Sequence, residues 1–274
     1  GHVTGVQTCA LPIYSVIVAT VVGVSGSSTV QLGDRLLFNA TGVQGGALRG
    51  TPMEDAVLSH VRDAFLRQKS HLAHLMDCDV FVEWIGPPLD VVVFGAGHDA
   101  QPFVRFAKDL GWKVTVADGR ANYATAARFP EADSVVVIRP DAPLKDIEIT
   151  RQTAVVMMTH NYPQDAKLLR HILPAKPRYL GILGPKSRTA DLLAEVSLPL
   201  TGIDLHAPVG LDLGSDAPEA VALAIAAEIQ AVLGARGGGM LKHRYAPIHE
   251  AAPETGQASP ALVQQTEAAI CELA

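Results

Sequence analysis

The chain has 274 residues and a formal net charge of −6 at pH 7, and 48% of its residues are hydrophobic and 18% charged. This composition is typical of a globular protein with one large domain or two small ones, and we expect two. A negative net charge, with 7 Phe, 5 Tyr and 2 Trp, provides neither a cationic field nor many stacking surfaces for nucleic acid. We therefore expect no nucleic acid as a partner.

The sequence also argues against a membrane span and a metal site. The longest apolar run, residues 15–24, is interrupted by Thr20 and Gly23 and falls short of the roughly 18 residues that a membrane helix needs. The 3 cysteines, Cys9, Cys78 and Cys271, fit neither a disulfide framework nor a zinc site of the CxxC type. We expect a reducing, cytoplasmic location, no membrane and no protein-bound metal.

The two ends of the chain differ from the rest. Residues 1–13, GHVTGVQTCALPI, lack the basic and apolar regions of a signal peptide and show no helical or strand period. They resemble translated sequencing-adapter sequence, so we expect a non-native leader that ends before Tyr14; a disordered native segment is the alternative. Residues 246–274 are predicted to be a flexible tail with one short helix.

Residues 14–86 are expected to form a smaller α+β N-terminal domain. Apolar residues at helical spacing predict a helix over residues 52–68, opened by a capping box of Thr51 and Glu54. Short apolar runs predict strands at residues 15–24, 35–38 and 79–85. Gly86-Pro87-Pro88 then ends regular structure and marks a domain boundary.

Residues 89–245 are expected to form a Rossmann-like domain with a parallel sheet. The apolar run Leu89–Phe94 is followed by a glycine turn, Gly95-Ala96-Gly97-His98-Asp99-Ala100, and a helical stretch to Leu110. In this GxGxxA pattern Gly95 permits the tight turn, Gly97 lets the backbone approach a phosphate, and Ala100 lets helix and strand pack closely. The N–H groups at the start of the helix favour an anion. A glycine turn that binds nothing is the alternative.

The following strand ends in a second candidate site residue. Residues 112–117 predict this strand, and Asp118 comes at its end, where an acid meets ribose hydroxyls in dinucleotide-binding folds. Arg120 stands two residues later, and a simple turn acid is the alternative for Asp118. The alternation of strands and helices continues and predicts a parallel sheet, with further strands at residues 134–138, 154–158 and 179–183.

Polar clusters follow two of these strands, where open α/β sheets bind ligands. After one strand come Thr159, His160 and Asn161; after the next come Gly184, Lys186 and Arg188. The second cluster suits a phosphate, and a capped helix with solvated charges is the alternative. His160 could be a ligand, a general base or a wall of the pocket, and we favour the wall. His98 faces either the ligand or solvent.

A long scaffold helix is expected at residues 217–233, capped by Asp216 and Glu219.

Several motifs together resemble the XdhC/CoxI family of xanthine dehydrogenase accessory proteins. The resemblance covers about residues 15–240, and its motifs are Ala19–Val22 with Gly26–Ser28, Gly95–Ala100, Ala117–Arg120, Arg128–Pro130, Thr159–Tyr162, Gly181–Arg188 and Ala207–Gly214. It implies a small N-terminal domain joined to a Rossmann domain. It also implies a cytoplasmic accessory protein, not itself an enzyme, that binds molybdenum cofactor, holds it while its terminal sulfido ligand is installed, and inserts it into a molybdenum hydroxylase of the xanthine dehydrogenase type.

The resemblance further implies a homodimer, contact with a cysteine desulfurase, and a cofactor in the molybdopterin or the cytosine dinucleotide form. The expected cofactor-binding residues are Gly95, Gly97, His98, Ala100, Asp118, Arg120, Thr159, His160, Asn161, Gly184, Lys186 and Arg188. A phosphate or pyrophosphate would lie at the helix start after Gly97, and Asp118 would meet a ribose. Two other functions stay open: an NAD(P)-dependent oxidoreductase with His160 as acid or base, and an interaction module with an empty site.

One departure from the family concerns a thiol. Family members often carry a cysteine in a glycine-rich stretch before an acid, whereas Gly45–Glu54 of this chain contains none. If that thiol helps to hold molybdenum or sulfur, this chain would hold its cofactor differently, bind it more weakly or serve another target. Cys78 is a candidate substitute, although a cysteine in an apolar strand is more often a small buried residue.

Overall fold

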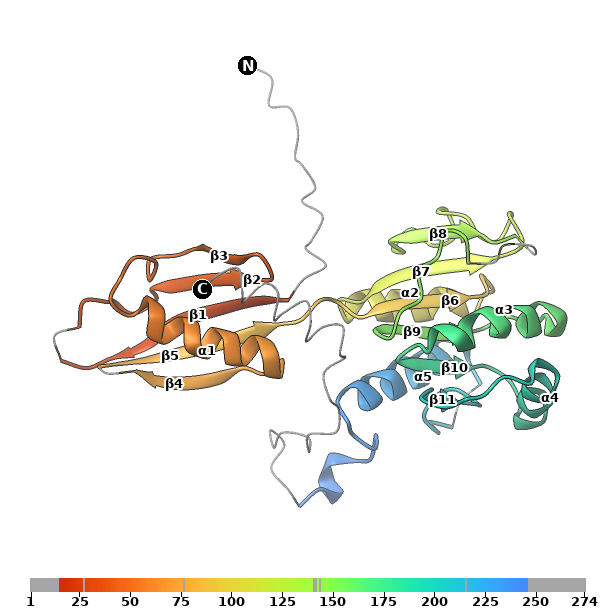
Figure 1. Cartoon of the computed structure of the whole chain (residues 1–274). Helices are drawn as coiled ribbons and strands as arrows, with labels where there is room; N and C mark the ends of the chain where they lie inside the picture. Colours follow the sequence, from red (N-terminus) through yellow and green to blue (C-terminus); the bar gives the residue numbers. More distant parts are fainter. Residues whose placement is uncertain are drawn as a thin grey trace. The chain divides into compact units, whose positions relative to one another are not determined.

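A computed structural model describes residues 15–245, without residues 27, 76, 140, 141, 143 and 215. The predicted leader and tail, with Cys9 and Cys271, lie outside these described residues. The chain divides into two compact units between Pro87 and Pro88 (Figure 1). Within the described ranges, no helix has the length and apolar character that crossing a membrane requires.

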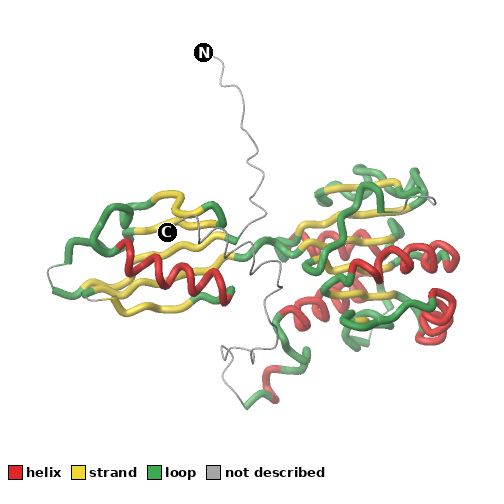
Figure 2. The backbone as a smooth tube through the Cα atoms, viewed as in Figure 1, coloured by secondary structure: helices red, strands yellow, loops and turns green. Residues whose placement is uncertain are grey.

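The N-terminal unit is an antiparallel sheet with a helix, α1, on one face (Figure 2). The strands are ordered β3-β2-β1-β5-β4, and their bounds are β1 Val16–Val24, β2 Arg35–Asn39, β3 Gly42–Gly45, β4 His71–Leu75 and β5 Cys78–Ile85. Alternate residues of β1, such as Ile17 and Ala19, are fully buried together with Val57 and Val61 of α1 (Glu54–Arg67). The period-two pattern that predicts the strand therefore also selects the face that α1 covers.

The predicted strands and helix of this unit are confirmed, but the capping box is wrong. Met53 precedes α1 and makes no side-chain cap bond. The Thr51 hydroxyl donates to the carbonyl of Leu48 over 2.7 Å, and the Glu54 carboxylate accepts from the backbone N–H of Gly50 over 2.6 Å. The tight turns before α1 thus engage both side chains that would have formed the box.

The C-terminal unit is a six-stranded parallel sheet of order β11-β10-β9-β6-β7-β8. Counted from β6, this is the 3-2-1-4-5-6 order of Rossmann folds, so the predicted α/β class with a Rossmann-like domain is confirmed. The strand bounds are β6 Asp90–Phe94, β7 Lys113–Asp118, β8 Ser134–Val137, β9 Thr153–Met157, β10 Tyr179–Ile182 and β11 Leu205–His206. The crevice where the strand order reverses lies between β6 and β9.

Helices cover both faces of this sheet, as the apolar strands require. On one face, Val91 and Val93 pack in a core with Phe103 of α2 and Ile225 of α5; on the other, Val92 belongs to a core with residues of α3 and α4. The helix bounds are α2 Ala100–Asp109, α3 Tyr162–Ala175, α4 Lys186–Val196 and α5 Pro218–Leu233. Figure 1 shows α3 and α4 together on one face.

The helix at residues 217–233 is confirmed as α5, but its predicted cap is wrong. Ala217 precedes α5 and makes no side-chain cap bond, and Pro218 occupies the first turn of the helix. Proline lacks a backbone N–H and has a fixed φ that suits the first helical position. The start of α5 is therefore set by Pro218 and not by Asp216 with Glu219.

Candidate functional site

The glycine turn connects β6 to α2 at the carboxyl edge of the parallel sheet. Gly95 has φ +116°, and a Cβ built there would lie 2.6 Å from the carbonyl oxygen of Met158 on the neighbouring strand segment. A Cβ on Gly97 would meet no atom within 4 Å, and Ala100 is fully buried at the start of α2. Glycine is thus required by the fold at position 95, whereas the space over Gly97 is open to a ligand.

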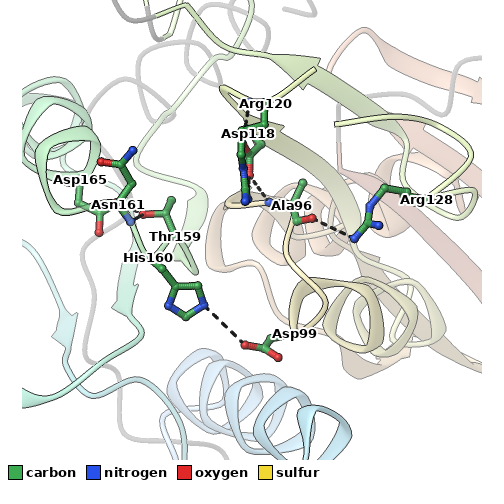
Figure 3. A network of polar contacts seen from close by, with 9 residues as sticks. All are labelled: Ala96, Asp99, Asp118, Arg120, Arg128, Thr159, His160, Asn161 and Asp165. Carbon is green, nitrogen blue, oxygen red and sulfur yellow. Dashed lines mark hydrogen bonds and ion pairs between the residues drawn. The ribbon is translucent and has the colours of Figure 1, made fainter. Parts of the chain in front are cut away.

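The carboxylate of Asp118 holds this turn (Figure 3). Asp118 ends β7 and is only 3% exposed. One of its oxygens accepts from the backbone N–H of Ala96 over 2.7 Å and from Nη2 of Arg120 over 2.7 Å. The other accepts from the backbone N–H of Arg120 over 2.8 Å and from its Nε over 3.0 Å. Four donors from the chain itself therefore occupy the lone-pair directions of one carboxylate.

These contacts keep Asp118 ionised. Burial acts to raise the pKa of Asp118, but the hydrogen bonds from Arg120 and Ala96 outweigh it, so the pKa lies below the ordinary value of 3.8. A ribose hydroxyl at Asp118 would have to displace one of the present donors. In this geometry Asp118 positions the glycine turn and Arg120.

Two arginines flank an aromatic ring beside the turn. The guanidinium carbon of Arg120 lies 3.9 Å from the centre of the Tyr123 ring, and that of Arg128 lies 4.8 Å from it. Nη2 of Arg128 also donates to the carbonyl of Ala96 over 3.4 Å. Sequence reasoning did not select Tyr123 or Arg128 as site residues, because neither lies in the glycine turn nor at a strand end.

A second polar network follows β9. Thr159 donates a hydrogen bond to Asp165, and Figure 3 shows both residues. Nη2 of Arg188 lies 2.6 Å from the same carboxylate. The side chain of Asp165 is 1% exposed and that of Arg188 is 21% exposed. Burial raises the pKa of Asp165 above its ordinary value, and the bonds from Thr159 and Arg188 oppose this without cancelling it. The network fixes the start of α3, where the Asn161 side chain accepts from the backbone N–H of Gln164 over 3.2 Å.

The remaining predicted residues lie around these two networks. The His160 side chain is 78% exposed, and its Nε2 is 3.9 Å from the Asp99 carboxylate across the β6–β9 crevice. His98 and Lys186 are exposed, and Gly184 has φ +124° before α4. Arg188, in contrast, already has a carboxylate partner. The structure therefore brings the glycine turn, Asp118, Arg120 and His160 to one edge and leaves Lys186 as the exposed cation of the second cluster.

A pocket of about 320 Å³ adjoins Arg120 at this edge. It lies among the residues that follow β7, the residues that follow β8 and the first turns of α3. Its lining residues are Gly119, Arg120, Ile138, Arg139, Asn161, Pro163, Gln164, Lys167 and Leu168. Sequence reasoning missed Arg139, Gln164 and Lys167, because segments far apart in the chain bring them together.

Two further observations concern metals and thiols. Over the described ranges, no group of three or more His, Cys, Asp or Glu side chains is placed to hold a metal ion. Cys78 is buried, at 5% exposure, and burial together with Asp79 and Asp77 raises its pKa. The thiol at Cys78 is therefore protonated and enclosed, as a small core residue is, and poorly suited to replace a reactive family cysteine.

The chain matches two family models. The one described as the XdhC Rossmann domain matches residues 91–229, and the one described as the XdhC and CoxI family matches residues 14–76. Together they cover both units of the fold, and the Rossmann match contains the glycine turn, Asp118 and the polar cluster after β9.

The chain is also similar to two curated proteins and to a solved structure. The chain is 33% identical over 160 residues to a protein of Bacillus subtilis (strain 168) that is named as a probable xanthine dehydrogenase subunit; the match covers 58% of this chain and 48% of that protein. It is 26% identical over 247 residues to the uncharacterized protein YqeB of Escherichia coli (strain K12), covering 82% of this chain and 45% of that protein. The chain thus spans about half the length of these relatives.

A crystal structure described as a xanthine dehydrogenase from Bacillus halodurans shares the fold. The TM-score is 0.52, and the identity is 23% over 81% of this chain and 92% of that one.

Proposed function

Because the chain belongs to the XdhC and CoxI family, we propose that it is an accessory protein that binds molybdenum cofactor, holds it during sulfuration, and inserts it into a molybdenum hydroxylase of the xanthine dehydrogenase type. The cofactor is cargo in this role, and the chain itself does not oxidise purines. The names of its relatives support the link to xanthine dehydrogenase. Sulfuration by a cysteine desulfurase, a homodimeric state and a cytoplasmic location belong to the same proposal.

The observation that carries the proposal is the open glycine turn. No atom lies within 4 Å of a Cβ built on Gly97, and α2 begins after Asp99 without a side-chain cap. The N–H groups at a helix start carry partial positive charge and bind anions. The turn therefore offers backbone donors and close approach to an anionic ligand, and Asp118 keeps it in place.

The side chains that follow the strands at the carboxyl edge of the sheet suit a pterin better than a bare metal. His160, Asn161 and His98 offer ring and amide groups to a heterocycle, and Lys186 offers a positive charge. Molybdenum in this cofactor is held by the dithiolene of the pterin. A carrier therefore needs contacts to the ring and the phosphate, and it needs no cluster of metal ligands.

An oxidoreductase using NAD(P) at the same turn is the second candidate. The strand order 3-2-1-4-5-6 and His160 beside the β6–β9 crevice favour it. The saturated carboxylate of Asp118 argues against it, since dinucleotide-binding folds use this acid for the ribose hydroxyls.

The test is cofactor retention by the full chain and by Gly97→Val. The substitution projects into open space, so the fold should persist, whereas bound ligand and the new side chain would compete for that space. We expect the original chain to retain pterin and molybdenum and to restore activity to a cofactor-free hydroxylase. Gly97→Val should retain at least about tenfold less, with an unchanged circular dichroism spectrum. Absence of pterin binding by the original chain would contradict the proposal.

A further inference from the structure

The pocket beside Arg120 is cationic, and its lining residues differ from those of the glycine turn. Three cationic side chains line it, Arg120, Arg139 and Lys167, and no carboxylate belongs to its lining among the residues that the structure describes. No residue of the glycine turn, Gly95 to Ala100, belongs to it either. The pocket is therefore a second place for an anion at this edge of the sheet.

The charges in the pocket are not all available. Arg120 is paired with Asp118, which cancels its charge, but the pair uses only Nε and Nη2. A guanidinium has five N–H donors, so Arg120 keeps further donors for a ligand. Arg139 and Lys167 are exposed, and neither has a carboxylate partner within the part of the chain that the structure describes. The local excess is therefore two positive charges.

This excess matches one class of anion. A phosphate monoester carries about −1.5 to −2 charges at pH 7 and has three strong acceptor oxygens, whereas each phosphate inside a diphosphate linkage carries about −1. The donors that face the pocket, on Arg120, Arg139, Lys167 and the amides of Asn161 and Gln164, suit those oxygens. Ile138 and Leu168 add apolar lining.

We infer that this pocket is a phosphate-monoester site, which in the proposed function takes the terminal phosphate of molybdopterin. Molybdopterin ends in a phosphate monoester, whereas the dinucleotide form carries a diphosphate at that place. The inference rests on the proposed function for the identity of the ligand, and on the pocket alone for its chemistry.

A phosphate monoester could belong to a pterin or to a nucleotide, and two pairs of probes distinguish these ligands. The first pair is the oxidised, fluorescent pterin phosphate obtained from molybdopterin and the same pterin after phosphatase treatment. The second pair is NADP⁺ and NAD⁺, which differ only in the 2′-phosphate monoester. Each member is titrated against the full chain, against the double variant Arg139→Gln with Lys167→Gln, and against a control, Arg105→Gln with Lys113→Gln. The control removes the same charge at exposed positions outside the pocket.

We expect the phosphorylated pterin to bind about tenfold or more tightly than its dephosphorylated form, because hydrogen bonds to a charged group are stronger than those to a neutral group. The pocket variant should lose this preference, and its affinity for the dephosphorylated pterin should equal that of the original chain. The control variant should keep the preference. A preference for NADP⁺ over NAD⁺ that the pocket variant loses would also support the site and would identify a nucleotide as its ligand.

Two results would overturn the inference: equal affinity within both pairs, or equal weakening of both members of each pair by the pocket substitutions. Failure of the proposed function looks different. In that case neither pterin binds, whereas NADP⁺ still binds through Arg139 and Lys167.

Discussion

The carboxylate of Asp118 accepts the backbone N–H of Ala96 over 2.7 Å, and so ties the end of β7 to the glycine turn of the adjacent strand β6. The acid that a dinucleotide-binding motif assigns to a ribose is here part of the turn itself. Because Arg120 occupies the rest of the same carboxylate, the turn, the acid and one wall of the cationic pocket form a single connected unit.

We predict that Asp118→Asn destabilises the C-terminal unit by about 1–3 kcal/mol, because the amide cannot accept all four hydrogen bonds and leaves a buried donor unsatisfied. The measurement is urea unfolding in a Trp84→Phe background, where Trp112, at 5% exposure, reports this unit alone. Glu195→Gln is the control in the same unit, since Glu195 forms an exposed pair with Arg170 that is worth less than about 1 kcal/mol. Equal losses for the two variants would contradict the role given to Asp118.

The lowered pKa of Asp118 predicts the sign of a pH effect. A group whose pKa is lower in the folded chain adds stability above its ordinary pKa, here 3.8, and that stability is lost as the pH falls through the folded value. The difference in unfolding free energy between the original chain and Asp118→Asn should be constant from about pH 5 to 7 and should shrink below pH 4. A difference that grows on acidification would show the opposite shift.

Asp165 is expected to show the opposite pH dependence, because burial raises its pKa in the folded chain. Its contribution to stability is then fully present below the ordinary pKa and is lost as the pH rises through the folded value. The unfolding free energy of the original chain, compared with that of Asp165→Asn, should therefore increase from pH 7 toward pH 4. A relative decrease over this interval would mean that Thr159 and Arg188 outweigh the burial.

The sequence predicts the Rossmann unit well because its signals are local. The run Leu89–Phe94, the glycine turn and the acid at position 118 each follow from their neighbours, and the strands confirm them. The short strands β3, β4 and β11 were not predicted. Each has at most one buried side chain, so no apolar period distinguishes it from a loop.

The polar contacts of the site could not be predicted in the same way. The partner of Asp118 on the turn, Ala96, lies 22 residues earlier, and the partner of Asp165, Arg188, lies 23 residues later. The pocket cations Arg139 and Lys167 follow different strands and meet only when the sheet forms. Such pairs depend on which strands are neighbours in the sheet, and the residues around each position do not reveal this order.

The two glycines of the turn should respond differently to the same substitution. We predict that Gly95→Ala costs about 1–3 kcal/mol, since φ at this position is +116° and the new Cβ would lie 2.6 Å from the Met158 carbonyl oxygen. Gly97→Ala meets no atom within 4 Å and should leave the unfolding free energy within about 1 kcal/mol of the original. Urea unfolding followed through Trp112 distinguishes them, and equal losses would contradict the turn geometry.

The most direct test of the proposed carrier function is equilibrium binding of molybdenum cofactor to the full chain in the presence of excess NAD(H). We predict that pterin and molybdenum are retained together and that NAD(H) does not displace them. Binding of NAD(H) without pterin, accompanied by hydride transfer to a substrate, would contradict the carrier function and would identify the chain as an oxidoreductase.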